Sequence, residues 1–157
     1  MYDEIITNCS RIYGIEEKLI RAIIKKESSG NKWAFRVERG FWARYFSGIK
    51  AIFSRTPNKD ELWLTYPDIV AASYGLMQIM LTTAMELGFR FQYPFELFEP
   101  ANNIKFGCLL LKKNFDRYGK WDDAISAYNQ GNNRKDSSGK YCNQYYVDKV
   151  KQFMVEG

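Results

Sequence analysis

The chain has 157 residues, of which 46% are hydrophobic, and it carries a formal net charge of +5. This length and apolar content suit a single domain with its own core, and the positive charge favours an anionic partner: a nucleic acid, an acidic membrane surface or an acidic cell-wall polymer. Histidine is absent, which excludes His-based triads, imidazole acid–base catalysis and His-containing metal sites. No apolar run approaches the roughly 20 residues of a membrane span.

The cysteines and the N-terminus give two further expectations. Cys9, Cys108 and Cys142 are widely spaced and form no CxxC pair, so a metal site is not expected. Three free thiols are favoured over one disulfide with one free thiol. The N-terminus, Met1-Tyr2-Asp3-Glu4, is acidic and lacks a signal-peptide pattern. Either the secretory route is not used or a leader has been removed.

Two helices are predicted in the first part of the chain. The first spans about 2–13, and Gly14 separates it from the second, which ends near Glu27. At helical spacing Glu27 projects between Ile20 and Ile23, with lysine and arginine side chains on the opposite side. A carboxylate at the end of an apolar stripe is costly to bury as an anion. We therefore expect its pKa to be raised, which would make it a proton donor near neutral pH.

The segment from about 32 to 72 is irregular and dense in aromatic side chains. Pro57 and Pro67 interrupt it, and short helices are expected within it. Its aromatic residues are Trp33, Phe35, Phe41, Trp42, Tyr45, Phe46, Phe53, Trp63 and Tyr66. For these rings we favour packing into a satellite core, a small hydrophobic cluster separate from the main core, over a platform that binds a ligand.

Periodicity and turn residues predict that the rest of the chain is helical. We expect a helical turn at 74–80 and then a helix from Thr82 or Thr83 to Leu87. The next helix is expected to be capped by Asn102 or Asn103 and ended by Gly119, and another is expected from Trp121 to Gly131. A polar loop at 132–140 then leads to a last helix from about Asn143. No alternating segment is long enough for a substantial sheet. The fold class is therefore predicted to be mainly α.

Three separated segments carry motifs whose order is more specific than any one of them. They are Glu27-Ser28-Ser29-Gly30-Asn31, Ser73-Tyr74-Gly75-Leu76-Met77-Gln78-Ile79-Met80 and Ala127-Tyr128-Asn129-Gln130-Gly131. In this order they resemble the lytic transglycosylase family, the SLT-type domain related to goose-type lysozyme. The late Tyr146-Val147 pair supports the resemblance.

The resemblance implies a lysozyme-like fold with a substrate cleft, which cleaves peptidoglycan between N-acetylmuramic acid (MurNAc) and N-acetylglucosamine (GlcNAc) without metal or cofactor. Glu27 takes the position of the catalytic glutamate. By the same match, the residues expected to bind substrate or border the cleft are Ser73, Met77, Gln78, Tyr128, Asn129 and Tyr146. Gln78 and Asn129 could instead satisfy buried backbone groups. Tyr128 and Tyr146 lie on apolar faces, so they are also expected to pack in the core.

The chemistry implied by the resemblance needs one carboxylate. The protonated acid donates to the glycosidic oxygen and then, as a base, takes the proton of the sugar's own 6-hydroxyl, which closes a 1,6-anhydro ring. An apolar setting that raises the pKa suits both the donation and the later uptake of the proton. Because the attacking hydroxyl belongs to the same sugar, proximity replaces a bound water.

The chain departs from the family pattern in three places. The segment between Glu27 and Gly75 is longer than in most members, as in variants often found in phage and prophage proteins. Met80-Leu81 stands in place of the usual Met-Pro, and Cys142 lies near the place of a usual acidic residue. The prediction is one lysozyme-like catalytic domain over 1–157, with an aromatic-rich insertion at about 32–72 that could extend the cleft as a lip.

Glu38, within that insertion, leaves a second interpretation open. As a second carboxylate near Glu27 it would allow hydrolysis through an activated water, as in a muramidase. Pairing with Arg36 or Arg39 at the surface is the favoured role. A non-catalytic peptidoglycan-binding module is a further alternative. A nucleic-acid-binding domain is disfavoured because the basic residues are dispersed.

The expected partner is therefore peptidoglycan, and the expected oligomeric state is a monomer. The expected place of action is the cell wall. Since no signal-peptide pattern is present, the wall would be reached by phage delivery, by a special export route or with a leader that has been removed.

Overall fold

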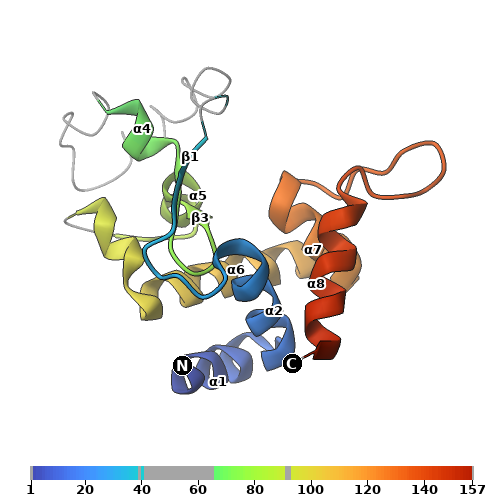
Figure 1. Ribbon diagram of the computed structural model, residues 1–157, viewed down its shortest axis with the longest axis horizontal. Coiled ribbons are helices and arrows are strands. Elements are labelled where there is room, and N and C mark those ends of the chain that lie inside the picture. The colour runs from blue at the N-terminus through green and yellow to red at the C-terminus, as the bar shows by residue number, and fades with distance from the viewer. Residues whose placement is uncertain (1, 39, 41–65, 91–92, 157) are drawn as a thin grey trace.

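The computed structural model describes residues 2–38, 40, 66–90 and 93–156. Over these residues the chain is mainly helical, as predicted (Figure 1). The short helices and the aromatic lip expected within the insertion fall largely on 41–65, outside the described residues.

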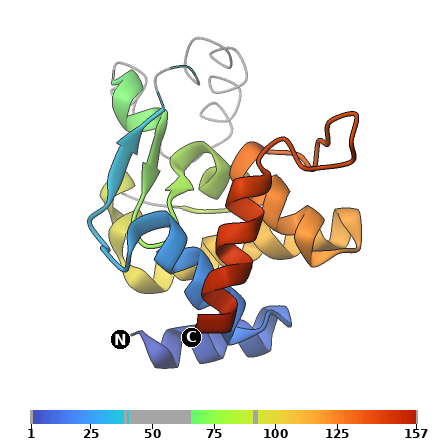
Figure 2. The same cartoon turned by 45° about the vertical axis from the view of Figure 1, so that its right-hand side comes forward.

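Five helices form the larger part of the described fold. Helix α1 (Asp3–Tyr13) packs on α2 (Glu17–Ser28) and on α6 (Pro100–Tyr118), while α6 also packs on α7 (Trp121–Gln130). Helix α8 (Gln144–Glu156) packs on both α2 and α7. Figures 1 and 2 both show α8 lying beside α2. The C-terminal helix therefore covers the helix that ends at the candidate catalytic glutamate.

A small antiparallel sheet lies on the other side of the molecule. Its strands are β1 (Phe35–Val37), β2 (Ala72–Tyr74) and β3 (Ile79–Met80), in the order β1-β2-β3. Phe35 lies opposite Tyr74, and Ser73 lies opposite Met80. The helical turn predicted at 74–80 is therefore wrong, because these residues form two strand ends and the tight turn between them.

Three short elements border this sheet. Helix α4 (Pro67–Val70) leads into β2, α5 (Leu81–Glu86) follows β3 directly, and the 3₁₀-helix η2 (Pro94–Phe98) precedes α6. Helix α5 begins one residue before the earliest predicted start. Helix α5 packs on β2 and β3, while η2 and β3 both contact α6.

The predicted helix ends agree with the structure more closely than the predicted caps. Helices α1, α6 and α7 end directly before Gly14, Gly119 and Gly131. The cap predicted for α6 is wrong: this helix starts at Pro100, and Asn103 lies inside it with its side chain fully buried. Asn103 therefore has another function, described below.

The core consists of apolar side chains from all these helices. Its fully buried members include Ile20 and Ile23 of α2, with the opposite side of that helix exposed. Cys9 and Cys108 are buried in the core and Cys142 is exposed; all three are free thiols, the state favoured from the sequence. None of the described helices combines the length and apolar character that crossing a bilayer requires.

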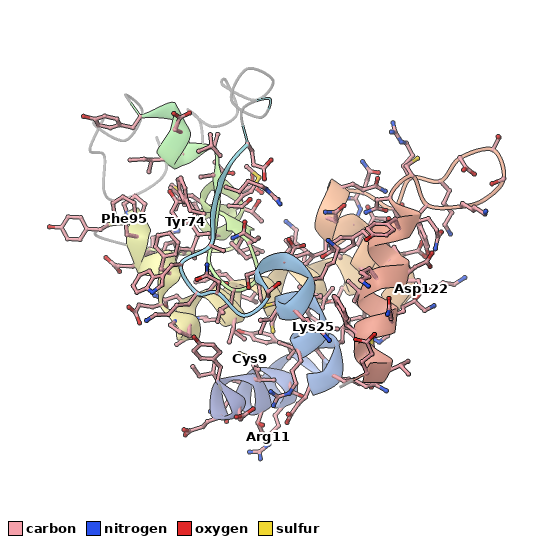
Figure 3. The ribbon with its side chains drawn as sticks, viewed as in Figure 1. Cys9, Arg11, Lys25, Tyr74, Phe95 and Asp122 are labelled. Carbon is pink, nitrogen blue, oxygen red and sulfur yellow. The ribbon has the colours of Figure 1, made fainter. Side chains whose placement is uncertain are left out.

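The described aromatic residues at the start of the insertion pack against η2. The ring of Phe98 lies 5.7 Å from Trp33 and 5.2 Å from Tyr74, measured between centroids. Phe35 contacts Tyr74 edge-on at 5.2 Å, and Phe95 stacks on Phe98 at the outer edge (Figure 3). Trp33 and Phe35 therefore contact this cluster of rings but remain 62% and 45% exposed, so the satellite core expected for them is not formed.

Candidate active site

Glu27 lies in the last turn of α2. The helix ends at Ser28, and the next residue, Ser29, has a left-handed φ of 53° and donates its N–H to the Lys25 carbonyl. The hydroxyl of Ser28 donates to the Leu76 carbonyl at 2.7 Å and accepts from the Gly30 N–H at 3.2 Å. Ser28 thus ties the end of α2 to the turn between β2 and β3, and this contact positions the helical turn that carries Glu27.

The Glu27 carboxyl is half-buried and accepts a hydrogen bond from α8. The phenol of Tyr146, itself almost fully buried, donates to Oε1 of Glu27 at 2.6 Å. Burial raises the pKa of Glu27 above its ordinary value, and the negative charge of Glu38 adds to this rise. The Tyr146 hydrogen bond and the positive charges of Arg36 and Lys26 lower the pKa without cancelling the rise. The raised pKa expected from the sequence is therefore present, and burial is its main cause.

The turn from Gly75 to Gln78 is held in place by a buried asparagine. Asn103 of α6 accepts from the Met77 N–H at 2.7 Å and donates to the Tyr74 and Leu97 carbonyls at 2.7 and 2.8 Å. One amide side chain thereby satisfies three buried backbone groups. Sequence reasoning assigned a cap to Asn103 and missed this role.

Tyr128 of α7 holds the same turn from the opposite side. Its phenol is buried and donates to the Met77 carbonyl at 2.8 Å. Burial raises the pKa of Tyr128 well above its ordinary value, with the charge of Glu27 as a smaller cause. Tyr128 therefore remains a neutral hydrogen-bond donor, and it joins α7 to the turn that α2 and α6 also contact.

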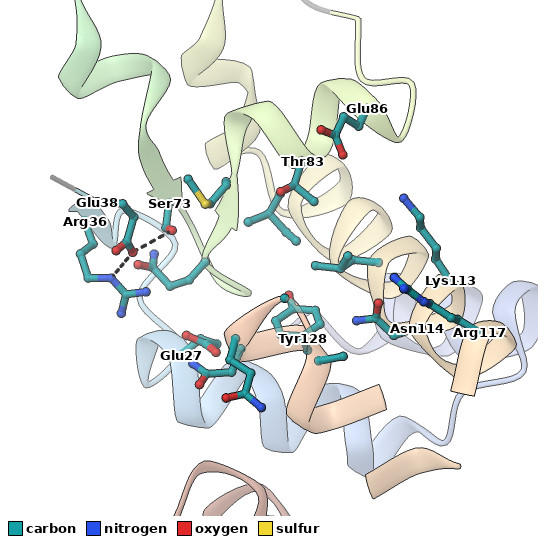
Figure 4. A pocket seen from close by; sticks show the side chains of 18 of the residues that line it. Glu27, Arg36, Glu38, Ser73, Thr83, Glu86, Lys113, Asn114, Arg117 and Tyr128 are labelled. Atoms are coloured by element: carbon teal, nitrogen blue, oxygen red, sulfur yellow. Dashed lines mark hydrogen bonds and ion pairs between the residues drawn. The ribbon is translucent and has the colours of Figure 1, made fainter. Parts of the chain in front are cut away.

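A cavity of about 700 Å³ opens beside Glu27. It is lined by Glu27, Arg36, Glu38, Gly40, Ser73, Gln78, Ile79, Met80, Thr83, Glu86, Leu110, Lys113, Asn114, Arg117, Ala127, Tyr128, Asn129, Gln130 and Gly131. Figure 4 shows Glu27 and Glu38 on one side of it and α6 on the other, with Tyr128 between them. The cavity brings together residues from all three motif segments.

Glu38 lies in this cavity rather than on a remote surface. Arg36 donates to its Oε1 at 2.6 Å, and the buried Ser73 hydroxyl donates to the same oxygen at 3.3 Å (Figure 4). The predicted pairing with Arg36 is therefore confirmed. The Ser73 hydroxyl, expected to border the cleft, therefore contacts the Glu38 carboxylate at the cavity wall.

Of the Gly-Leu-Met-Gln motif, Met77 differs from what was expected, whereas Gln78 borders the cavity as expected. Met77 is fully buried, packs against Gly107 of α6 and is not among the cavity-lining residues, so it is placed for packing rather than for contact with a ligand. Gln78 lines the cavity in a left-handed conformation (φ 46°). Its amide donates to the Ala34 and Gly75 carbonyls at 3.0 Å, which is the backbone-satisfying alternative.

Asn129 is exposed at the cavity rim. Its Oδ1 accepts from Asn143 at 3.0 Å, and Asn143 also accepts from Ser126 at 2.7 Å. Asn143 thereby orients Asn129 from the start of α8. No motif drew attention to Asn143, because its position opposite α7 depends on the path of the 132–143 loop.

The opposite wall of the cavity was not expected from the sequence. Thr83 and Glu86 come from α5, and Lys113, Asn114 and Arg117 come from α6. These residues belong to no recognised motif, and helical periodicity alone cannot say which polar face of α6 borders a cavity. Among the described residues, no cluster of three acidic or cysteine side chains is arranged to hold a metal ion.

Comparison with known proteins agrees with this geometry. Residues 4–149 match the family model described as Transglycosylase SLT domain. A curated protein, the transglycosylase of Enterobacteria phage PRD1, is 30% identical over 137 residues, which are 87% of this chain and 37% of that protein. The chain therefore spans little more than a third of the length of this relative. No solved structure matches the chain significantly. The mainly α, lysozyme-like fold predicted from the motifs is confirmed, and the chain belongs to the Transglycosylase SLT domain family.

Proposed function

We propose that this chain is a peptidoglycan lytic transglycosylase that cleaves the β-1,4 bond between MurNAc and GlcNAc, with Glu27 as acid and then base. The observation that carries the proposal is the Glu27 carboxyl, half-buried beside the cavity with a raised pKa and a hydrogen bond from Tyr146. Family membership and the name of the phage relative support the reaction class. The bond cleaved, the product and the role of Glu27 are our inference.

In the first step the protonated Glu27 donates to the glycosidic oxygen. The bond between that oxygen and C1 of MurNAc breaks, GlcNAc leaves with a hydroxyl, and positive charge develops at C1. This step needs a protonated carboxyl, and burial of Glu27 favours that form because it raises the pKa. The hydrogen bond from Tyr146 to Oε1 keeps the carboxyl in one orientation and leaves Oε2 for the proton.

In the second step the Glu27 carboxylate takes the proton of the MurNAc 6-hydroxyl. Oxygen O6 bonds to C1, which closes the 1,6-anhydro ring and returns the proton to Glu27. The Tyr146 hydrogen bond and the Arg36 charge both favour the carboxylate at this stage, since each lowers the pKa of Glu27. Intramolecular attack removes the need for an ordered water.

The cavity residues from the motifs would hold the sugars. Ser73, Gln78 and Asn129 line it with polar groups, and Tyr128 contributes part of its wall. Peptidoglycan is the proposed partner and the cell wall the proposed place of action, which suits a chain with a net charge of +5.

Digestion of purified peptidoglycan, followed by mass analysis of the soluble muropeptides, tests the proposal. We expect 1,6-anhydro products from the wild type, and a loss of about 10³-fold or more in rate for Glu27→Gln because the proton donor is gone. Glu4→Gln, at an exposed site on α1, is the matched control and should digest as the wild type does. Unchanged digestion by Glu27→Gln would refute the assigned role. Retained wall binding with no digestion by the wild type would favour the binding module.

The position of Glu38 supports hydrolysis as the second candidate reaction. It lines the same cavity, and its charge is close enough to affect the pKa of Glu27. Within the described part of the chain, both hydrogen bonds to its carboxylate go to Oε1, which leaves Oε2 for a water. A muramidase would release reducing ends one water heavier than the anhydro product and would lose them in Glu38→Gln. Anhydro products from both wild type and Glu38→Gln would reject this alternative.

A further inference from the structure

The residue directly before α8 joins that helix to α7. Asn143 lies at the N-cap position, where its carbonyl accepts from the Tyr146 and Val147 N–H groups at 2.8 and 3.4 Å. An asparagine at this position commonly turns its side chain toward the N–H groups of its own helix. Within the described part of the chain, however, all three hydrogen bonds of the Asn143 side chain go to α7, which packs on α8 (Figure 1). The side chain therefore contacts α7 rather than capping α8.

A backbone group fixes the direction of these hydrogen bonds. Nδ2 of Asn143 donates to the Ser126 carbonyl at 3.0 Å, and a carbonyl can only accept. The same Nδ2 donates to Oδ1 of Asn129 at 3.0 Å, where an amide nitrogen of Asn129 would meet another donor. On the other side, the Ser126 hydroxyl accepts from Gln130 at 3.0 Å and donates to Oδ1 of Asn143 at 2.7 Å. Every hydrogen bond of the set therefore agrees with one orientation of the Asn129 amide.

In that orientation Asn129 offers donors to the cavity. The residue is exposed and lines the cavity, and its Oδ1 is turned toward Asn143. Among the described residues its Nδ2 makes no hydrogen bond, so both N–H groups remain for a ligand. A glycan strand carries hydroxyl, ring and carbonyl oxygens, all of which can accept from an amide N–H.

We propose that Asn143 is a positioning residue, which turns the Asn129 amide so that Nδ2 donates to an oxygen of the bound glycan. This inference rests on the proposed function and adds to the site a residue that lies outside the three motif segments. The contact with the sugar would be the same before and during bond cleavage. Its loss should therefore raise KM and leave kcat nearly unchanged.

The variant Asn143→Asp tests the orientation. Aspartate also favours the N-cap position, so α8 and the hydrogen bond from Tyr146 to Glu27 should be retained. Its carboxylate has no donor, however, so the Asn129 amide should turn over and face the cavity with its oxygen. On soluble glycan strands we expect KM to rise roughly three- to ten-fold, the range for one lost hydrogen bond, with kcat nearly unchanged. Urea unfolding checks that the variant is folded, and its pH–rate profile should stay near that of the wild type.

Variants of Asn129 show whether Asn143 acts through it. Asn129→Asp can still accept from Asn143 but presents an oxygen to the cavity, so KM should rise by a similar factor. In the background of Asn129→Ala, which has no amide to turn, Asn143→Asp should raise KM no further. The matched control is Asn132→Asp, which adds the same charge at an exposed site and can still accept from the Arg134 N–H. This control should keep the wild-type KM.

The outcomes separate this inference from the proposed function. A folded Asn143→Asp variant with the wild-type KM would overturn the inference, as would independent effects of the Asn143 and Asn129 substitutions on KM. A loss confined to kcat, with a displaced pH–rate profile, would mean that Asn143 acts through α8 and Glu27, and it would overturn the inference too. Each of these results leaves the proposed function standing. A folded wild type that cleaves no glycan would overturn both.

Discussion

The phenol of Tyr146 donates a 2.6 Å hydrogen bond to Oε1 of Glu27, and this contact joins the last helix of the chain to the end of the second. It connects residues that are 119 positions apart. Since the hydrogen bond favours the charged carboxylate while burial favours the neutral acid, the pKa of Glu27 depends on both.

Replacement of Tyr146 by Phe should therefore raise the pKa of Glu27 further. A general acid works only while protonated, so kcat/KM should be constant at low pH and fall as pH rises through that pKa. In Tyr146→Phe the fall should begin about one to two pH units higher, since a hydrogen bond to a charged group is typically worth about 1.5–3 kcal/mol. The pH–rate profile measures this shift.

Tyr145→Phe is the control for this experiment. Tyr145 precedes Tyr146 on α8, but its side chain is 75% exposed, so the same loss of a hydroxyl should leave the profile unchanged. A fall in activity at lower pH in Tyr146→Phe would contradict the assigned contact.

Arg36 and Glu38 should move the same profile in opposite directions. The Arg36 charge lowers the pKa of Glu27 and the Glu38 charge raises it. Arg36→Gln should therefore shift the loss of activity to higher pH, and Glu38→Gln should shift it to lower pH. Lys151→Gln, which removes a cation paired with Asp122, should have no effect. Shifts in the same direction for the two cavity variants would show that their charges do not act on Glu27 in this way.

Glu27 should also make stability depend on pH in a measurable way. Its pKa is raised in the folded protein, so the folded state holds the proton more tightly than the unfolded state. The wild type should lose stability as pH rises from the ordinary carboxyl pKa to the raised value, with every tenfold change in proton affinity corresponding to about 1.4 kcal/mol. Glu27→Gln lacks this titration and should become more stable than the wild type over that window.

Urea unfolding of both proteins between pH 4 and pH 8, roughly the range around a raised carboxyl pKa, measures the difference. The free energy of unfolding of Glu27→Gln minus that of the wild type should grow with pH and then level off. For Glu4→Gln, at an exposed site, the difference in unfolding free energy from the wild type should not change with pH. A flat difference for Glu27→Gln as well would mean that the pKa of Glu27 is not raised by folding.

Sequence reasoning located the helices and Glu27 because these depend on local pattern. The apolar stripe of Ile20 and Ile23 sets the buried face of α2, and Glu27 follows from it by spacing alone. The glycines after α1, α6 and α7 end helices whatever surrounds them. These signals lie within a few residues of the structure that they specify.

The errors concern residues whose structure depends on distant partners. Strands β2 and β3 have only three and two residues, too few for alternation to be visible, and they exist because β1 pairs with β2. Asn103 resembles a helix cap until the turn around Met77 is placed beside it. Lys113 borders the cavity only because of how α6 packs. Tertiary contacts determine the short strands, the role of Asn103 and the position of Lys113, and the local sequence carries little information about such contacts.

Gly75 and Asn103 offer the sharpest test of how the turn is held. A Cβ on Gly75 would lie 2.5 Å from Asn103 Nδ2, and the φ of +69° is unfavourable for any other residue. Gly75→Ala should thus cost the strain of that φ, about 1 kcal/mol, together with the displacement of a buried asparagine that makes three hydrogen bonds. We expect a total loss of roughly 3–5 kcal/mol of unfolding free energy, with reduced glycan cleavage because the turn carries Gln78.

Gly139→Ala separates the two contributions. Gly139 also has positive φ, +82°, but nothing lies within 4 Å of its added Cβ, so only the backbone strain of about 1 kcal/mol should be lost. In the background of Asn103→Ala, which removes the clashing amide, Gly75→Ala should cost no more than Gly139→Ala does. Denaturant unfolding of the wild type, the two single variants and the double variant gives the coupling energy directly, and we expect about 2–4 kcal/mol. Additive losses would mean that the turn is not held against Asn103.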